Sequence, residues 1–428
     1  MNALASCALA LATAFAAASC PAADVSPARP QIPSRTFNLR DFGAAGDGRT
    51  SDTPAFEKAI GAVDRAGGGT LTVPAGTYFT GPFDLCSSID LHLEKGATLL
   101  FSQKFDDYRL SSKKYRPMIG GSGLHDVAIS GEGVIDGQGQ PWWVLERKAK
   151  TDARRRGLPD AEIGRPRMIQ LTSCERLLFS GITLQNSPMF HLVPSKSTDV
   201  TVYGISIKSP ADSPNTDGID PSACKRVLIE HCRVDTGDDC VAVKGGSGPD
   251  EDILVTDCTF LHGHGCSIGS DTLAGVRNMT VRRCTFDGTS AGVRLKSRRG
   301  RGGMVENVTY SDLQMRNVGQ AIVISSFYYG LPRPGEHVDA EAAGPETPAW
   351  RNITIKNIVA KSGTRDAGLI IGLPEMPARG ILLENVTIDA PIGLRIAYAD
   401  GVTLRNVKVN ADSGRGLLVE DTVSNLVH

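Results

Sequence analysis

The sequence has almost no net charge and lacks any pair of cysteines in C-x-x-C spacing. Lys and Arg number 46 and Asp and Glu number 47, so the formal net charge of the 428 residues is −1. No global positive field favours nucleic acid, and attraction to a polyanion has to come from a local basic patch. The absence of C-x-x-C pairs argues against a zinc site.

Long hydrophobic runs are missing everywhere except at the N-terminus. Residues 1–23 contain no charged side chain and are rich in Ala and Leu, a composition typical of a secretory signal peptide. This segment is too short and too Ala-rich for a membrane span, and no other stretch approaches the ~20 apolar residues required. We predict a signal peptide over 1–23 and secretion to the extracellular space or periplasm, with a lipid anchor at Cys20 as the alternative.

Eight of the ten cysteines lie beyond that signal, and six of these fall between residues 224 and 284. Such clustering suits an oxidising compartment. The eight are Cys86, Cys174, Cys224, Cys232, Cys240, Cys258, Cys266 and Cys284.

The chain repeats itself at a fixed interval. Similar segments begin at Val227, Ile253 and Met279, equally spaced in the chain, and each alternates apolar and polar residues as a strand does. Gly, Asn and Asp separate the copies and indicate turns. Repeats this short without helices between them predict a right-handed parallel β-helix, because the leucine-rich signature is missing and propeller blades need about 40 residues. Weaker copies begin at Val200, Val308, Ile353, Ile381 and Val402.

A solenoid needs a cap at its open end. Residues 51–54 followed by AFEKAIGAV predict an N-capped helix that covers the amino-terminal end of the core. Residues 141–167 lose the strand pattern and carry several basic residues, so we expect an inserted loop with some helix. A second insertion is expected at about 330–348. No linker divides the chain, which predicts a single catalytic domain over 24–428.

The repeat register places polar residues from several coils on one face. It aligns Asp238 with His264 and Ala242 with Ile268, and residues 215–217 occupy the phase of 237–239 one coil earlier. Residues at one phase of a β-helix lie above one another, so we expect a single patch. Its members are Asp217, Asp238, Asp239, His264, Arg294 and Lys296.

Three crowded carboxylates cannot all ionise easily, so at least one pKa is expected to rise. Glycosidases use a protonated acid beside an ionised base, and Arg294 and Lys296 supply cations for a substrate carboxylate. Two simpler readings exist for an Asp pair, a turn that satisfies backbone amides and a calcium site.

Four motifs resemble the signatures of glycoside hydrolase family 28, the polygalacturonase family. They are Asn-Thr-Asp at 215–217, Gly-Asp-Asp at 237–239, Gly-His-Gly at 263–265 and Arg-Leu-Lys at 294–296. The resemblance runs from about residue 37 to residue 409. It implies hydrolysis of α-1,4-galacturonosyl linkages with inversion, and it implies neither a metal nor an organic cofactor.

The resemblance also implies roles for the catalytic residues. Asp238 would be the general acid, and Asp217 and Asp239 would hold and activate the water. His264 would tune the protonation of the acid.

The substrate-binding residues implied by the resemblance are Asn215, Arg294, Lys296 and Tyr328, with Tyr329 as a rival to Tyr328. The resemblance favours a Cys240–Cys258 disulfide. The repeat register instead places Cys240 over Cys266, within disulfide reach, and free stacked thiols are the third option.

The expected partner is a polyanionic pectin polysaccharide, bound by a monomer, with endo action weakly favoured over exo action. The alternatives are a rhamnogalacturonan or xylogalacturonan hydrolase, a calcium-dependent pectate lyase, and a non-catalytic carbohydrate-binding β-helix. The basic run at 298–301 could extend the substrate site or form a solvated loop. The basic loop at 148–156 is expected to be solvated, with lining of the substrate groove as the alternative. Four Asn-x-Thr sequons could be glycosylated or could belong to the turns of the β-helix: Asn278, Asn307, Asn352 and Asn385.

Overall fold

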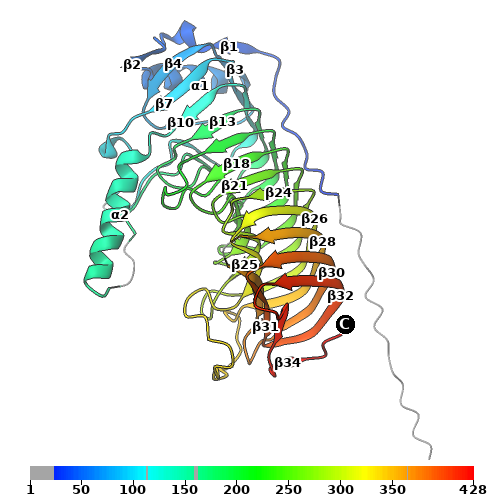
Figure 1. Cartoon of the computed structure of the whole chain (residues 1–428). Helices are drawn as coiled ribbons and strands as arrows, with labels where there is room; N and C mark the ends of the chain where they lie inside the picture. The colour runs from blue at the N-terminus through cyan, green and yellow to red at the C-terminus, as the bar shows by residue number, and fades with distance from the viewer. Residues whose placement is uncertain (1–23, 112–113, 159–161, 364) are drawn as a thin grey trace, which may run out of the picture.

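The computed structural model describes residues 24–111, 114–158, 162–363 and 365–428, and the predicted signal peptide and Cys20 lie outside these ranges. The chain forms the predicted parallel β-helix, a solenoid of stacked coils in which the strands pair in parallel with the coils before and after them (Figure 1). One continuous hydrophobic core extends through the stack from Leu39 to Leu404.

Three groups of strands make up the faces of the solenoid. The four-stranded sheet contains β5 (Phe83–Asp84), β8 (Ile119–Ser122), β11 (Ile169–Thr172) and β14 (Leu192–Ser195). The seven-stranded sheet contains β19 (Val241–Val243), β22 (Cys266–Gly269), β25 (Ala291–Lys296), β27 (Gln320–Ser325), β29 (Asp366–Ile371), β31 (Ile392–Ala397) and β33 (Leu417–Val419). The remaining strands form one large sheet: β1 (Thr36–Asn38), β2 (Asp47–Ser51), β3 (Gly69–Val73), β4 (Gly76–Thr80), β6 (Ile89–Leu93), β7 (Ala97–Phe101), β9 (His125–Gly131), β10 (Val134–Asp136), β12 (Glu175–Ser180), β13 (Thr183–Gln185), β15 (Thr198–Tyr203), β16 (Ser206–Lys208), β17 (Lys225–Glu230), β18 (Arg233–Thr236), β20 (Asp250–Thr256), β21 (Thr259–His262), β23 (Val276–Arg282), β24 (Thr285–Asp287), β26 (Met304–Val318), β28 (Ala349–Ser362), β30 (Ala378–Ala390), β32 (Ala399–Ala411) and β34 (Val423–Ser424).

The predicted capping helix is present as α1 (Thr53–Arg65), which buries Phe56 and Val63 in the amino-terminal end of the core. The Asp52 side chain does not cap this helix and instead accepts hydrogen bonds from the backbone N–H groups of residues 45 and 46. The first insertion contains a longer helix, α2 (Gln140–Arg155), which stands away from the side of the solenoid (Figure 1). Two short 3-10 helices, η1 (Leu39–Phe42) and η2 (Phe105–Asp107), complete the described helices.

The predicted register is confirmed in the central coils, where Val227 pairs with Ile253 and Ile253 pairs with Met279. It is wrong by one residue in the seven-stranded sheet, because Ala242 pairs with Ser267 and not with Ile268. The turn between β21 and β22 is one residue shorter than the turn between β18 and β19. Residues after the shorter turn therefore pair one position earlier than the repeat predicts.

The eight described cysteines are buried free thiols. The Cys240 thiol lies 3.6 Å from the carbonyl oxygen of His262, so the Cys240–Cys258 disulfide implied by the resemblance is not formed. Cys240 does not lie over Cys266 either, because Cys266 pairs with Val241. Cys232 and Cys258 do stack one coil apart, with the Cys232 N–H 3.4 Å from the Cys258 sulfur.

Side chains in left-handed turn conformations form two ladders along the solenoid. L-residues rarely adopt positive φ, and Asn and Asp tolerate it best because their short side chains bond locally. The first ladder is ionic at one end and amide-based at the other, and its members are Asp126, Arg176, Asp199, Arg226, Asp252, Asn278, Asn307 and Asn352. The second ladder contains His231, Asp257, Arg283, Asp312, Asn357, Asn385 and Asn406.

The four sequon asparagines belong to these ladders. Asn307 donates to Asn278, Asn352 donates to Asn307, and Asn385 donates to Asn357, each through the side-chain nitrogen that a glycan would occupy. The second of the two sequon readings, turn structure of the β-helix, therefore accounts for their positions.

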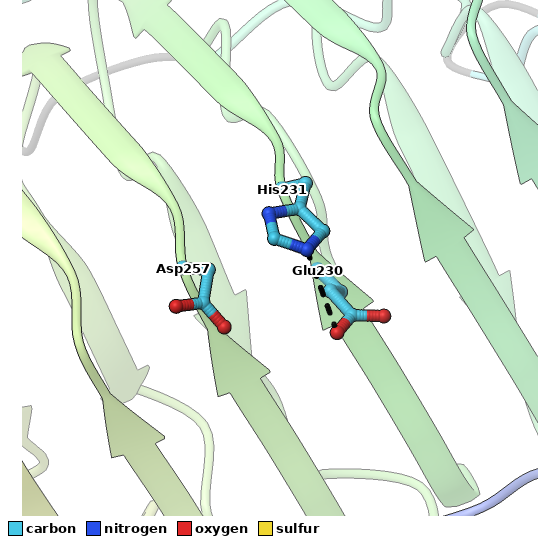
Figure 2. Close-up of side chains that lie close together, drawn as sticks. All are labelled: Glu230, His231 and Asp257. Carbon is cyan, nitrogen blue, oxygen red and sulfur yellow. Dashed lines mark ion pairs between the residues drawn. The ribbon is translucent and has the colours of Figure 1, made fainter.

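Figure 2 shows Glu230, His231 and Asp257, whose ligand atoms lie close enough together to suggest a metal site. His231 and Asp257 occupy one position of the second ladder in successive coils, both with positive φ. Both oxygens of Asp257 accept hydrogen bonds from Arg283 in the next coil. Turn structure therefore explains this cluster.

The buried Asp250 predicts that the fold loses stability between about pH 4 and pH 7. Burial raises its pKa to about 7, and Oδ2 has no hydrogen-bond partner among the described residues. A carboxyl with a raised folded pKa costs stability as pH rises from about 4 through that value. Asp250→Asn should therefore stabilise the protein by roughly 2–4 kcal/mol at pH 8 and have little effect at pH 4, since each pKa unit corresponds to about 1.4 kcal/mol.

Urea unfolding at both pH values measures this effect. Asp252→Asn changes the same charge at a partly exposed position and serves as the control. Equal effects of Asp250→Asn at pH 4 and pH 8 would contradict the assignment.

Candidate active site

The predicted patch lies at the junction between the four-stranded and seven-stranded sheets. At this coil the strand is reduced to single bridges, in which Ile219 pairs with Leu192 on one side and with Val241 on the other. Asp217 lies just before that bridge, and Asp238 and Asp239 lie in the turn before β19. The structure thus brings the three aspartates into adjacent coils, as the predicted alignment of 215–217 with 237–239 requires.

Asp239 is the most strongly held carboxylate of the patch. Its Oδ1 accepts hydrogen bonds from Arg294 at 2.6 Å and from Ser267 at 2.8 Å, and its Oδ2 accepts one from Lys296 at 2.6 Å. Arg294 and Lys296 lie two residues apart on β25, so strand alternation points both side chains to the same face. Burial raises the pKa of Asp239, but the charges of Lys296 and Arg294 outweigh it and hold that pKa well below its ordinary value.

Asp238 is the aspartate most open to a ligand. Its side chain is 22% exposed, whereas that of Asp239 is 3% exposed. The Nδ1 of His264 lies 3.0 Å from Asp238 Oδ1, which also accepts the backbone N–H of Asp239. Burial raises the pKa of Asp238, but the hydrogen bond with His264 and the nearby cations outweigh this, and the pKa lies below its ordinary value.

Asp217 shares a buried lysine with a fourth carboxylate, Asp220. Lys244 Nζ donates to Asp217 Oδ2 at 3.0 Å and also contacts Asp220 Oδ2. Burial, reinforced by the charge of Asp220, raises the pKa of Asp217 well above its ordinary value, and burial likewise raises that of Asp220. The raised pKa expected from crowding therefore belongs to Asp217 and not to Asp238.

The sequence interpretation did not include Lys244 and Asp220 in the patch. The repeat alignment contained a signal for Lys244, because this residue shares the phase of Lys296 across two coils. Asp220 had no comparable signal.

Asn215 lies beside this group and contacts the first insertion. Its Oδ1 accepts hydrogen bonds from Arg165 at 2.7 Å and from Lys150 at 3.1 Å. The expectation that the basic loop at 148–156 is solvated is therefore wrong for Lys150. Arg165 was missed altogether, since an insertion without repeats gives no register from which its contacts could be predicted.

Tyr328 borders the patch from the chain between β27 and the second insertion. Lys296 Nζ lies 5.5 Å from the centre of its ring, within the range of a cation–π contact. Its rival Tyr329 is 72% exposed and lies near Arg298. In the basic run at 298–301, Arg299 forms a bidentate pair with Glu375, which is a structural contact.

Ligand atoms of Asp238, Asp239 and His264 lie within 4.8 Å of one another, close enough to hold a metal ion. Both oxygens of Asp239, however, already accept hydrogen bonds from Arg294 and Lys296. Calcium needs six to eight oxygen ligands, and two cations this close repel a third. The donor set therefore fits a calcium ion poorly.

Comparison with known proteins finds a matching family model and several polygalacturonases among the relatives. The family model described as glycosyl hydrolases family 28 matches residues 66–412, and a model described as rhamnogalacturonase A/epimerase, pectate lyase-like, matches residues 36–91. A probable polygalacturonase of Vitis vinifera is 32% identical over 378 residues, covering 82% of this chain and 74% of that protein. An endo-polygalacturonase of Pectobacterium carotovorum subsp. carotovorum is 32% identical over 331 residues, covering 72% of this chain and 78% of that protein.

Among solved structures, a hyperthermoactive exopolygalacturonase from Thermotoga maritima superposes with a TM-score of 0.77 at 32% identity. The match covers 90% of this chain and 94% of that one.

Lys244 is predicted to be essential to the stability of the site. Lys244→Met leaves Asp217 and Asp220 buried without their cation, and breaking a buried pair in this way costs about 3–5 kcal/mol. The loss should be larger at pH 8 than at pH 5, because carboxyls with raised folded pKa values are most costly when ionised. Denaturant unfolding measures it, with the exposed Lys208→Met as control.

Adding Asp220→Asn to Lys244→Met should recover part of the stability, because it removes one of the two uncompensated charges. A loss that did not depend on pH would argue against this account.

Proposed function

The chain belongs to glycosyl hydrolases family 28, and from that membership we propose that it is a polygalacturonase that hydrolyses α-1,4-galacturonosyl linkages of pectin with inversion. The observation that carries the proposal is the buried Asp239 between Arg294 and Lys296, next to the more exposed Asp238–His264 pair. Carboxylates for acid–base catalysis lie beside the cations Arg294 and Lys296, and hydrolysis of a polyanionic sugar requires both kinds of group.

Asp238 acts as the general acid in this proposal. It is the aspartate whose side chain is most exposed, so the glycosidic oxygen can reach it. Asp238 donates a proton to that oxygen as the bond to the anomeric carbon breaks. His264, at 3.0 Å, orients the acid and tunes its pKa.

Asp217 and Asp239 hold the attacking water. Asp239 is kept ionised by its two cations, so it can accept the proton that the water loses. Asp217 Oδ1 is buried and has no hydrogen-bond partner among the described residues, so this atom can form a hydrogen bond with the same water. Attack on the face opposite the leaving group inverts the anomeric centre.

Arg294 and Lys296 bind the carboxylate of the sugar at the cleavage site, together with Asn215 and Tyr328. When Asp238 carries the proton that it donates, Asp239 neutralises only one of the two positive charges, so this part of the patch then has net positive charge for a uronate. Tyr328 offers an aromatic face beside Lys296.

The other activities considered fit the site less well. A calcium-dependent lyase needs the aspartates as metal ligands, whereas three cations already bind them. A neutral rhamnose at the cleavage site would leave the charge of Arg294 and Lys296 unused, which favours galacturonan over rhamnogalacturonan. Endo action stays a prediction from the sequence.

Export is proposed from the composition of residues 1–23. In the described part of the chain, no helix is both long and apolar enough to cross a bilayer. A polymer as large as pectin has to be met outside the cytoplasm, which agrees with secretion.

Incubation with polygalacturonic acid in EDTA tests the reaction class. We expect new reducing ends without an ultraviolet-absorbing unsaturated product, and a loss of roughly 10²–10⁴-fold in kcat for Asp238→Asn. Asp235→Asn, whose carboxylate pairs with His262, should retain activity as the matched control. Mixed oligomers would indicate endo action and monomer alone exo action.

Activity that required added calcium and produced an unsaturated product would overturn the hydrolase assignment.

The pH profile should reveal how Asp238 obtains its proton. In the free protein the pKa of Asp238 lies below its ordinary value. A bound uronate adds a like charge and excludes water, and both effects raise that pKa. The descending limb of kcat should therefore lie about one pH unit or more above that of kcat/KM. Coinciding limbs would argue against Asp238 as the acid.

A further inference from the structure

The side-chain amide of Asn215 is held from one side by two cations. Arg165 Nη2 lies 2.7 Å and Lys150 Nζ lies 3.1 Å from its Oδ1. Arg and Lys carry only donors, so the atom that they contact must be the amide oxygen. This fixes an orientation that the positions of the heavy atoms alone leave ambiguous.

Arg165 is itself clamped in place. Its side chain is fully buried, and its Nη1 donates to the backbone carbonyls of Pro188 at 3.0 Å and Pro214 at 2.8 Å. Pro214 directly precedes Asn215, so Arg165 holds both the turn and the side chain that it carries. Asn215 has positive φ, a conformation in which Asn is favoured over most residues.

Glu146 links the clamp to α2. This fully buried carboxylate lies 3.1 Å from Lys150 Nζ and 3.4 Å from Arg165 Nη2, and it accepts the backbone N–H of Ile163 at 3.0 Å. One buried acid therefore joins the two arms of the insertion and holds both cations over Asn215. The charges of Glu162, Asp217 and Asp238 also act on Arg165, so the two cations lie in a strongly acidic surrounding.

We propose that Lys150 and Arg165 are positioning residues that hold Asn215 so that it offers the substrate only hydrogen-bond donors. With its oxygen committed to two cations, Asn215 presents the two N–H groups of Nδ2 on the opposite side. The ligand atom it takes is an acceptor oxygen of a uronate, from a carboxylate or a hydroxyl group. The inference deepens the proposed function and rests on it for the identity of the ligand.

The inference also gives the insertion a role in substrate recognition. The β-helix repeats supply the aspartates and the cations of β25, whereas α2 and the chain that follows it orient the remaining polar group. An isolated solenoid without this insertion would leave the Asn215 amide free to rotate.

Asn215→Asp tests the orientation with nearly the same shape. The new carboxylate still accepts from Lys150 and Arg165 and pairs with both cations, so thermal stability should be unchanged or higher. The side facing the substrate changes from a donor to an anionic acceptor. We therefore expect KM for galacturonate oligomers to rise at least tenfold while kcat changes less.

Lys150→Met tests the clamp without replacing a fully buried side chain, because the Lys150 side chain is 22% exposed. KM should rise about two- to fivefold. Lys148→Met removes the same charge from an exposed position on the same helix and should leave KM unchanged. In the Asn215→Asp background, Lys150→Met should lower the melting temperature more than it does in the native background, since it then breaks a second ion pair, with the new carboxylate, besides the one with Glu146.

An unchanged KM in Asn215→Asp, or additive effects on melting temperature in the double variant, would overturn the proposal. The thermal measurements need no substrate. A native protein that failed to cleave polygalacturonic acid would therefore refute the proposed function without removing the test of the clamp.

Discussion

Parallel hydrogen bonding between successive coils is the constraint on which the rest of the molecule depends. It sets residues one coil apart at strand spacing, about 4.8 Å, however far apart they lie in the chain. The bridge from Ile219 to Val241 brings Asp217 beside Asp239, and the pairing of β22 with β25 brings Arg294 beside Ser267. The backbone register therefore brings these side chains together at the site.

The charges of the site form two groups, one of which lowers the pKa of a carboxylate while the other leaves the pKa values of two carboxylates raised. Asp239 has two cations and stays ionised, whereas Asp217 and Asp220 share one lysine and have raised pKa values. Ionised carboxylates are costly to bury unless cations and hydrogen bonds compensate their charge. The number of cations that each carboxylate contacts therefore separates the pKa values of Asp217 and Asp239.

The repeats and the insertion that contains α2 have different roles in the molecule. The repeats provide the core and the turn ladders, in which ionic and amide side chains occupy left-handed positions. The insertion that contains α2 follows no repeat, yet it supplies Lys150 and Arg165 to the edge of the site. A stable repeating scaffold can accept such an insertion because each coil contacts only its neighbours.

The sequence by itself determined the β-helix, the helix that caps it, and the convergence of Asp217, Asp238, Asp239, His264, Arg294 and Lys296, because a fixed period maps sequence distance onto position. Because the turn before β22 is one residue shorter than the turn before β19, the alignment predicted from the repeat is wrong by one position for Ile268 and Cys266. Only the tertiary structure decided that the described thiols are free, that Asp217 rather than Asp238 has the raised pKa, and that Arg165 reaches Asn215. These features depend on burial and on the path of an insertion, and neither is encoded in a repeating pattern.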